Sequence, residues 1–162
     1  MAFVVCCCRL SIFPTELNRY GKGSKLSGFI YIYPISDSRF AGITARNFGA
    51  FRKLCDDGTL KNVILVTNKW GDVAREAAEA RENELSGNLF KPALDKGARM
   101  ARHYGTTQSA HDIIRMIIGN YPVPSPIQRE LVDKQKYIID TVAGGEGESA
   151  TRGRKQTAIG RP

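Results

Sequence analysis

Two runs of apolar residues decide the fold: Gly-Phe-Ile-Tyr-Ile-Tyr at positions 28–33 and Val-Ile-Leu-Val-Thr at positions 63–67. Both runs are continuous rather than alternating, are rich in β-branched and aromatic residues, and are bounded by turn-forming residues. Such runs are typical of strands that are buried on both faces of a parallel sheet. The sequence therefore predicts an α/β domain with a parallel sheet.

Helical patterns alternate with these strands. Residues 44–55 link the two runs into a strand-helix-strand unit, with Thr44 as the expected N-cap and Asp56-Asp57-Gly58 as the expected end. Residues 72–86 form a second expected helix that stops at Gly87. A loop or short helical turn is expected at 89–97, and a short strand at 99–104.

A third helix is expected to be capped by Thr107 or Ser109 and to end at Gly119. The apolar positions of each helix predict the face that packs on the sheet. These positions are Phe48, Phe51 and Cys55 in the first helix, Val73, Ala77, Ala80 and Leu85 in the second, and Ala110, Ile113, Ile114, Ile117 and Ile118 in the third.

Composition divides the chain into five segments. Residues 1–19 are a divergent apolar segment, in which a buried strand is favoured over S-acylation of its cysteines and over a secretory signal. Residues 20–120 form the α/β domain, and three prolines within 121–126 predict an extended linker. Residues 127–143 are expected to form a C-terminal helix. The basic tail at 144–162 has nothing to bury and is expected to be disordered.

The positive charge is spread unevenly along the chain. It has 24 Lys and Arg against 16 Asp and Glu, a net charge of +8, and residues 1–53 hold 8 basic and 2 acidic side chains. These cations fall on several expected elements rather than on one face interleaved with aromatics, so nucleic acid is disfavoured as a partner. No apolar run reaches the roughly 18 residues of a transmembrane segment.

Three of the four cysteines are consecutive, Cys6-Cys7-Cys8, and the fourth is Cys55. Adjacent cysteines do not match the ligand spacing of zinc sites, and no paired disulfide framework is evident. We therefore expect no metal site and a reducing, cytoplasmic location.

The chemistry of a parallel sheet is expected beyond the carboxyl ends of its strands. After Thr67 the chain reads Asn68-Lys69-Trp70-Gly71-Asp72, which supplies an amide, an ammonium group and a carboxylate that together suit the edge of a purine. Trp70 is either a base-stacking group or a hydrophobic lid over the strand end. His103, after the next strand, is either a second stacking group or a surface residue.

Several short motifs then carry a family resemblance. They are Lys22-Gly23-Ser24-Lys25-Leu26-Ser27-Gly28, Ile35-Ser36-Asp37-Ser38-Arg39, Asn47-Phe48, Phe51-Arg52-Lys53-Leu54-Cys55 and Val66-Thr67-Asn68-Lys69-Trp70-Gly71. As a combination, over about residues 20–145, they resemble the second half of fungal P-loop GTPase-like proteins, whose G domain is similar to those of the septin and AIG-like groups.

The resemblance implies an incomplete three-layer P-loop NTPase-like fold, with about three family strands and a possible N-terminal strand. Residues 28–33 and 63–67 would be the fourth and fifth strands of the G domain, 44–55 its third helix and 109–118 its final helix. It also implies guanine nucleotide, GTP or GDP, as the ligand, with Mg²⁺ only in a complete domain. The implied base-binding residues are Thr67, Asn68, Lys69, Trp70, Asp72 and His103.

The phosphate-binding machinery of that family is missing from these 162 residues. The sequence contains no Gly-x-x-x-x-Gly-Lys-Ser/Thr and no Asp-x-x-Gly, and Gly21-Lys22-Gly23-Ser24 is only a partial match. Because phosphoryl transfer needs this loop and its metal, no intrinsic GTP hydrolysis is expected. Guanine specificity is also in doubt, since Gly71 or Trp70, depending on register, stands where the family has aspartate.

Three functions remain open from the sequence. The first is a partial G-domain-like protein that retains the base-recognition half, and the second is a non-catalytic interaction or structural protein that contacts a second copy or another G domain. The third is a basic nucleic-acid-associated module. Residues 1–18 do not continue the family pattern, so a truncated or misjoined reading of a longer gene is also considered.

Overall fold

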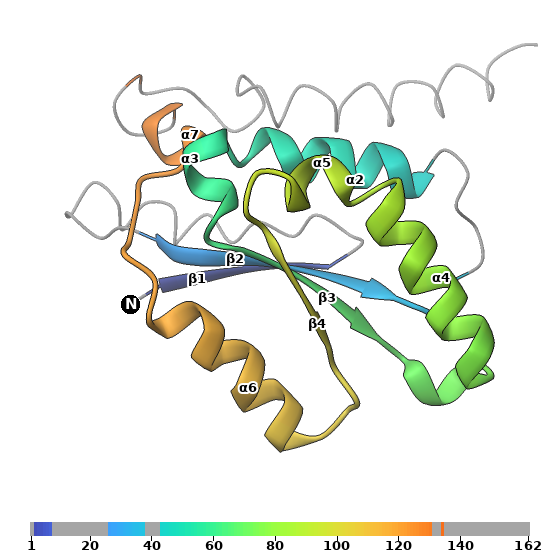
Figure 1. Cartoon of the computed structure of the whole chain (residues 1–162). Helices are drawn as coiled ribbons and strands as arrows, with labels where there is room; N and C mark the ends of the chain where they lie inside the picture. The colour runs from blue at the N-terminus through green and yellow to red at the C-terminus, as the bar shows by residue number, and fades with distance from the viewer. Residues whose placement is uncertain (1, 8–25, 38–42, 131–133, 135–162) are drawn as a thin grey trace, which may run out of the picture.

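The computed structural model describes residues 2–7, 26–37, 43–130 and 134, and its centre is a parallel sheet (Figure 1). Strands β2 (Leu26–Pro34), β3 (Val63–Asn68) and β4 (Arg99–Arg102) pair in that order, and β1 (Ala2–Cys7) pairs in parallel with the other edge of β2. The three strands predicted from residues 28–33, 63–67 and 99–104 are confirmed, and β1 lies within the 1–19 segment in which a strand is favoured.

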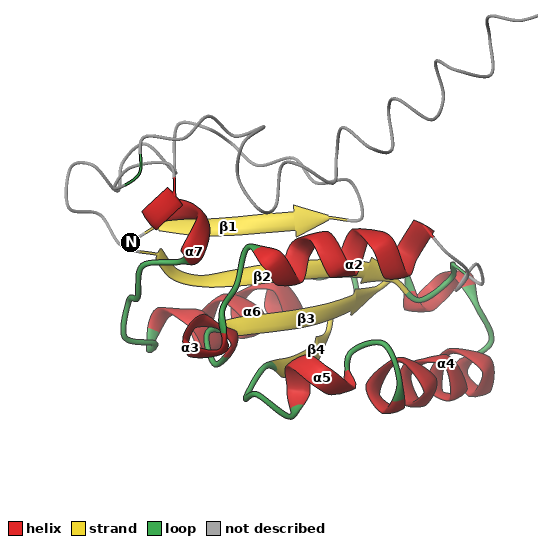
Figure 2. Cartoon of the chain, turned by 90° about the horizontal axis from the view of Figure 1, so that it is seen from above, coloured by secondary structure: helices red, strands yellow, loops and turns green. Residues whose placement is uncertain are grey.

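Helices cover both faces of this sheet (Figure 2). One face carries α2 (Ile43–Lys53), α4 (Arg75–Gly87) and the short α5 (Lys91–Leu94), while α6 (Thr107–Ile118) crosses the opposite face. Two short helices, α3 (Asp57–Leu60) and α7 (Pro126–Gln128), and a 3₁₀ turn, η2 (Trp70–Asp72), complete the described elements. No described helix has the length and apolar character of a membrane span.

The side chains of β2 and β3 divide the core in two, because successive residues of a strand point to opposite faces. Phe29, Tyr31 and Tyr33 pack with α2, α4 and α5, and the Tyr31 ring lies 4.9 Å from that of Phe51 and 6.1 Å from that of Phe90. On the other face Ile30, Ile64 and Val66 pack against Ile113 and Ile117 of α6. The continuous apolar runs therefore bury both faces, as predicted.

The inward face of α4 differs from the prediction. Ala78 and Leu85 are buried, whereas Ala77 and Ala80 are exposed and Val73 is half-buried. Between these two buried residues, the positions one helical turn along on the same face are charged. Arg81 donates to Ile35 O at 3.0 Å, and Glu82 binds Arg102. Two charged residues with long-range partners thus take positions on the inward face, which a pattern of apolar letters does not reveal.

The expected ends of two helices are also corrected. The helix expected from residue 72 begins at Arg75, because Val73 is extended with φ −142°. Asp56, expected to help end the preceding helix, instead starts α3: its Oδ1 accepts the Thr59 N–H at 2.9 Å. A carboxylate at that position satisfies an amide that the first turn of a helix leaves unpaired.

The third predicted helix is confirmed, with two corrections. Thr106 caps it rather than Thr107 or Ser109. Ile113 and Ile117 are buried, but Ile114 and Ile118 are 38% and 45% exposed. The apolar stripe is wider than the strip of helix that contacts the sheet.

After α6 the chain returns as the extended connector that the prolines predicted, and Val123 N–H donates to Leu26 O at 3.1 Å. The predicted helix at 127–143 falls mostly outside the described residues. The described part is helical: α7 begins at Pro126, and residues 129 and 130 follow it as a π-helical turn. The expected disordered tail at 144–162 also lies outside them, as do Cys8 and most of the divergent segment.

Candidate functional site

The candidate site lies where β3 and β4 end side by side. Thr67 pairs with Arg102 in the parallel register, and His103 N–H donates to Thr67 O at 2.8 Å. Because side chains alternate along a strand, Thr67 and Arg102 point to the α4 face, whereas Asn68 and His103 belong to the α6 face. The six predicted site residues are therefore brought to one edge of the sheet but are divided between its two faces.

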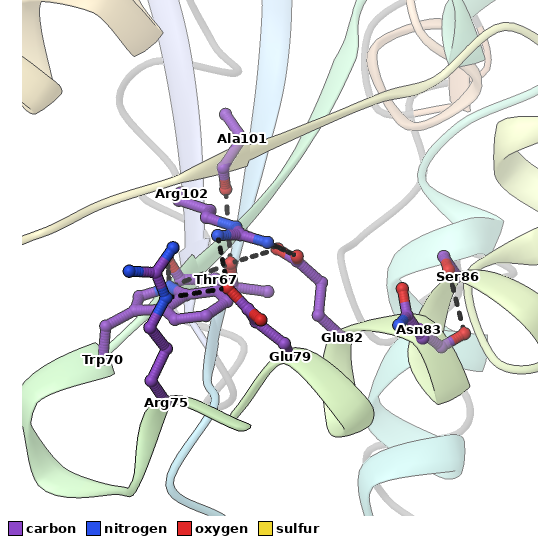
Figure 3. A network of polar contacts seen from close by, with 9 residues as sticks. All are labelled: Thr67, Trp70, Arg75, Glu79, Glu82, Asn83, Ser86, Ala101 and Arg102. Atoms are coloured by element: carbon purple, nitrogen blue, oxygen red, sulfur yellow. Dashed lines mark hydrogen bonds and ion pairs between the residues drawn. The ribbon is translucent and has the colours of Figure 1, made fainter. Parts of the chain in front are cut away.

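On the α4 face, Arg102 and Glu82 form the centre of a polar network (Figure 3). Arg102 Nε donates to both carboxylate oxygens of Glu82, at 3.0 and 3.1 Å, and Nη2 lies 2.5 Å from Oε2. These hydrogen bonds raise the pKa of Arg102 above its ordinary value, and burial opposes the rise only in part. Thr67 Oγ1 donates to Glu82 Oε1 at 3.3 Å, which ties the strand end to α4.

Trp70 lies on the same network. Its indole Nε1–H is 3.2 Å from both Thr67 O and Thr67 Oγ1, and the Arg102 guanidinium sits 4.3 Å from the ring centroid, a cation–π contact. The Tyr104 ring is 6.2 Å away. The indole covers the end of β3, and Arg102 occupies one of its two faces.

The loop between β3 and η2 exposes its charges. Lys69 adopts a left-handed conformation, φ 60°, and begins the 3₁₀ turn that contains Asp72. The Lys69 ammonium lies 4.0 Å from the Asp72 carboxylate, and both side chains are more than half exposed. Asp72 is thus paired with its own loop at the surface.

The α6 face has a different character. A hollow of about 160 Å³ lies between the sheet and α6, and its lining is almost wholly apolar. It is lined by Ile30, Ile32, Val66, His103, Ala110, Ile113 and Ile114. A cavity of about 150 Å³ with walls of this kind holds an aromatic ring such as benzene.

Two polar residues lie at the strand ends on this face of the sheet: His103 lines the hollow, whereas Asn68 does not. His103 Nδ1 lies 2.9 Å from Ser109 Oγ, which fixes the orientation of the imidazole and leaves Nε2 without a partner among the described residues. Asn68 Oδ1 is buried and has no hydrogen-bond partner among those residues either. Buried carbonyl oxygens are normally paired, and this amide oxygen is one of several buried polar atoms of the described residues that are available to bond a ligand or a water.

Sequence reasoning missed three residues here: Glu82, Arg102 and Ser109. Arg102 stands at the end of a predicted strand, which is a usable signal, but Glu82 sits within an apparently solvated helix. The sequence suggests only a capping role for Ser109; it is the third residue of α6, and its Oγ accepts the Tyr104 N–H at 3.2 Å. Among the described residues, no group of His, Cys, Asp and Glu side chains could hold a metal ion.

No family model matches the chain, and no curated protein matches its sequence. The structure defines its class as a small α/β domain in which a parallel sheet, with β2, β3 and β4 as its three predicted strands, is flanked by helices.

Proposed function

We propose that this chain binds the base of a guanine nucleotide, GTP or GDP, at the carboxyl ends of β3 and β4 on the α6 face. The observation that carries the proposal is the buried, unpartnered Oδ1 of Asn68, on the same sheet face as the apolar hollow that His103 lines. An apolar hollow with a few polar groups near it is the usual form of a small-molecule site.

The chemistry of a purine fits these groups. Its flat ring suits the apolar hollow, and His103 can stack on it or bond through Nε2. Its N–H and amino groups supply the donors that Asn68 Oδ1 lacks. Recovering a hydrogen bond for a buried acceptor is favourable, because an unpaired one costs about 1–3 kcal/mol.

The proposed role is binding without hydrolysis. These 162 residues contain no phosphate-binding loop and no Asp-x-x-Gly, so they supply neither the phosphate cradle nor the metal ligands of a GTPase. In this proposal Mg²⁺ contributes only when a complete domain is present, and the chain acts in the cytoplasm as the base-recognition half of a G-domain-like protein.

A role as a non-catalytic interaction scaffold is the second candidate. It is favoured by the apolar residues that α6 and the following segment leave at the surface: Ile114, Ile118 and Tyr121, the last of which is 80% exposed. A second copy of the chain or another G-domain-like protein would be the partner.

Titration with fluorescent analogues of GTP, GDP and ATP, with and without Mg²⁺, tests the first candidate. We expect saturable binding of the guanine analogues that weakens by about tenfold in Asn68→Ala and in His103→Ala, the loss expected for one hydrogen bond. His111→Ala, an exposed histidine on α6, is the matched control and should bind like the parent chain.

Absence of binding up to millimolar nucleotide would overturn the proposal. If the same samples then show concentration-dependent association by light scattering, and Ile118→Ser abolishes it, the scaffold role takes its place.

A further inference from the structure

The outer edge of β4 is a second feature of the site region, and nucleotide binding does not use it. β4 is the last strand of the sheet, and no described strand pairs with its outer side. In Figure 1, β4 runs in front of β3, with α6 on one side and α4 on the other. An open strand edge is a template for the addition of another strand.

The hydrogen bonds between β3 and β4 show which backbone N–H and C=O groups of β4 point outward. His103 N–H bonds inward to Thr67 O, and in a strand the N–H and C=O of alternate residues point to the same side. Met100 and Arg102 therefore direct their N–H and C=O groups outward. None of these four groups has a hydrogen-bond partner among the described residues.

Two depressions border this edge, one on each face of the sheet. The larger, about 460 Å³, is lined by Trp70, Gly71, Arg75, Glu79, Arg102 and Tyr104. The smaller, about 270 Å³, lies toward α6 and includes Ala101, Ile113 and Met116. Both share Arg102 and Tyr104, so the edge runs between them.

This arrangement is what strand addition requires. Main-chain hydrogen bonds hold an added strand, and pockets on the two faces receive its alternate side chains. We propose that the β4 edge binds an extended segment of a partner protein, with acidic side chains toward α4 and aliphatic side chains toward α6.

The charges of the two depressions set this pattern. The larger depression has two cations, Arg75 and Arg102, against one carboxylate, Glu79. Arg75 is 81% exposed, and its Nε donates to Glu79 at 3.0 Å, so its terminal amino groups are open to a second carboxylate. In the smaller depression Asp112 is already bound by Arg115 at 2.9 Å, and Ile113 and Met116 favour an aliphatic side chain.

Pairing of β4 with a second copy of the chain is the alternative. Because Met100 and Arg102 present the outward groups, antiparallel pairing of β4 about a two-fold axis at Ala101 would place Met100 opposite Arg102 of the other copy. That register offers no acidic side chain to the depression beside α4, whereas an acidic peptide does.

The test uses the full chain and the capped peptide Ac-Val-Glu-Val-Glu-Val-NH₂, with binding followed by calorimetry and by amide shifts of Met100 and Arg102. Two N-methylated forms, one blocked at the valines and one at the glutamates, remove the N–H groups on one side of the strand each. We expect one of them to lose binding and the other to keep it.

Variants of the protein locate the edge. Met100→Pro removes an outward N–H without touching the inner ladder, a substitution that edge strands tolerate, and should weaken binding by about tenfold. Arg75→Ala should weaken binding of this peptide but not of its glutamine analogue, and Lys91→Ala, exposed on α5, is the control.

Three results would overturn the proposal. They are no binding at millimolar peptide, equal binding of both N-methylated forms, and self-association of the chain that Met100→Pro abolishes. If Met100→Pro does not fold, the N-methylated peptides decide the question on the unaltered chain.

Discussion

Gly28 in β2 is the position where a single methyl group should test how the sheet packs on its surroundings. A Cβ at this position would lie 2.4 Å from Asn62 O and 3.0 Å from Ile117 Cγ2. Asn62 O is held in place, since it accepts the Phe29 N–H at 3.0 Å, and Asn62 Nδ2 donates to Tyr121 O at 2.9 Å. Gly28→Ala therefore cannot be accommodated by a flexible side chain alone.

The expected cost has two parts. Overpacking of a close-packed interior costs about 1–3 kcal/mol, and a weakened Phe29–Asn62 hydrogen bond adds about 1 kcal/mol, so the free energy of unfolding should fall by about 2–4 kcal/mol. Gly49 provides the matched control. It lies within α2, and a Cβ added there would meet nothing within 4 Å, so Gly49→Ala should be stabilising by about 0.5–1 kcal/mol.

The assay is urea unfolding followed by far-ultraviolet circular dichroism and by the fluorescence of Trp70, the single tryptophan of the chain. In thermal unfolding, where 1 kcal/mol corresponds to about 2–4 °C, Gly28→Ala should lower the melting temperature by roughly 5–15 °C. A Gly28→Ala protein within about 0.5 kcal/mol of the parent, the range of an ordinary surface substitution, would refute the packing of β2 against the segment before β3.

Two further predictions concern charged groups. Glu82→Gln should shift the emission of Trp70 to longer wavelength and lower the free energy of unfolding by roughly 1 kcal/mol, because the partly exposed Arg102 loses its charged partner. The control Glu84→Gln changes an exposed residue of the same helix and should leave the spectrum unchanged. An unchanged spectrum in Glu82→Gln would contradict the network. Burial raises the pKa of Asp56, but hydrogen bonds from Thr59 and Arg129 outweigh it and lower the pKa below the ordinary value. Asp56→Asn keeps the helix cap, so its free energy of unfolding in urea should be lower than that of the parent chain at pH 7, and this difference should vanish as the pH falls below about 4. A difference that persists at pH 2 would argue against this role.

The sheet could be predicted from the sequence because its central strands are buried on both faces. The runs at 28–33 and 63–67 are apolar at every position or nearly so, and only a strand covered on both sides needs that composition. The third helix was predictable for a similar reason, since Ile113 and Ile117 recur at helical spacing. Local pattern and global fold agree in these elements.

The charged part of the site could not be predicted in the same way. Glu82 and Arg102 are 20 residues apart and meet only because β3 and β4 pair and α4 packs beside them. Neither residue carries a local signal, since Glu82 reads as the solvated side of a helix and Arg102 as an ordinary end of a strand. Long-range pairing of this kind is set by topology, which periodicity does not encode.

The alternation of a strand also changes what the contiguous segment Thr67–Asp72 can do. Thr67 and Trp70 are bound into the α4 face with Arg102, whereas Asn68, one residue along, belongs to the α6 face with His103. A motif that looks like one loop is therefore shared by two surfaces on opposite sides of the sheet. Ile113 lines both the hollow and the smaller depression, but Asn68 and His103 belong to nucleotide binding alone and Arg75 and Met100 to strand addition alone. Substitutions at these four residues should therefore affect one activity each, and the two proposals stand or fall separately.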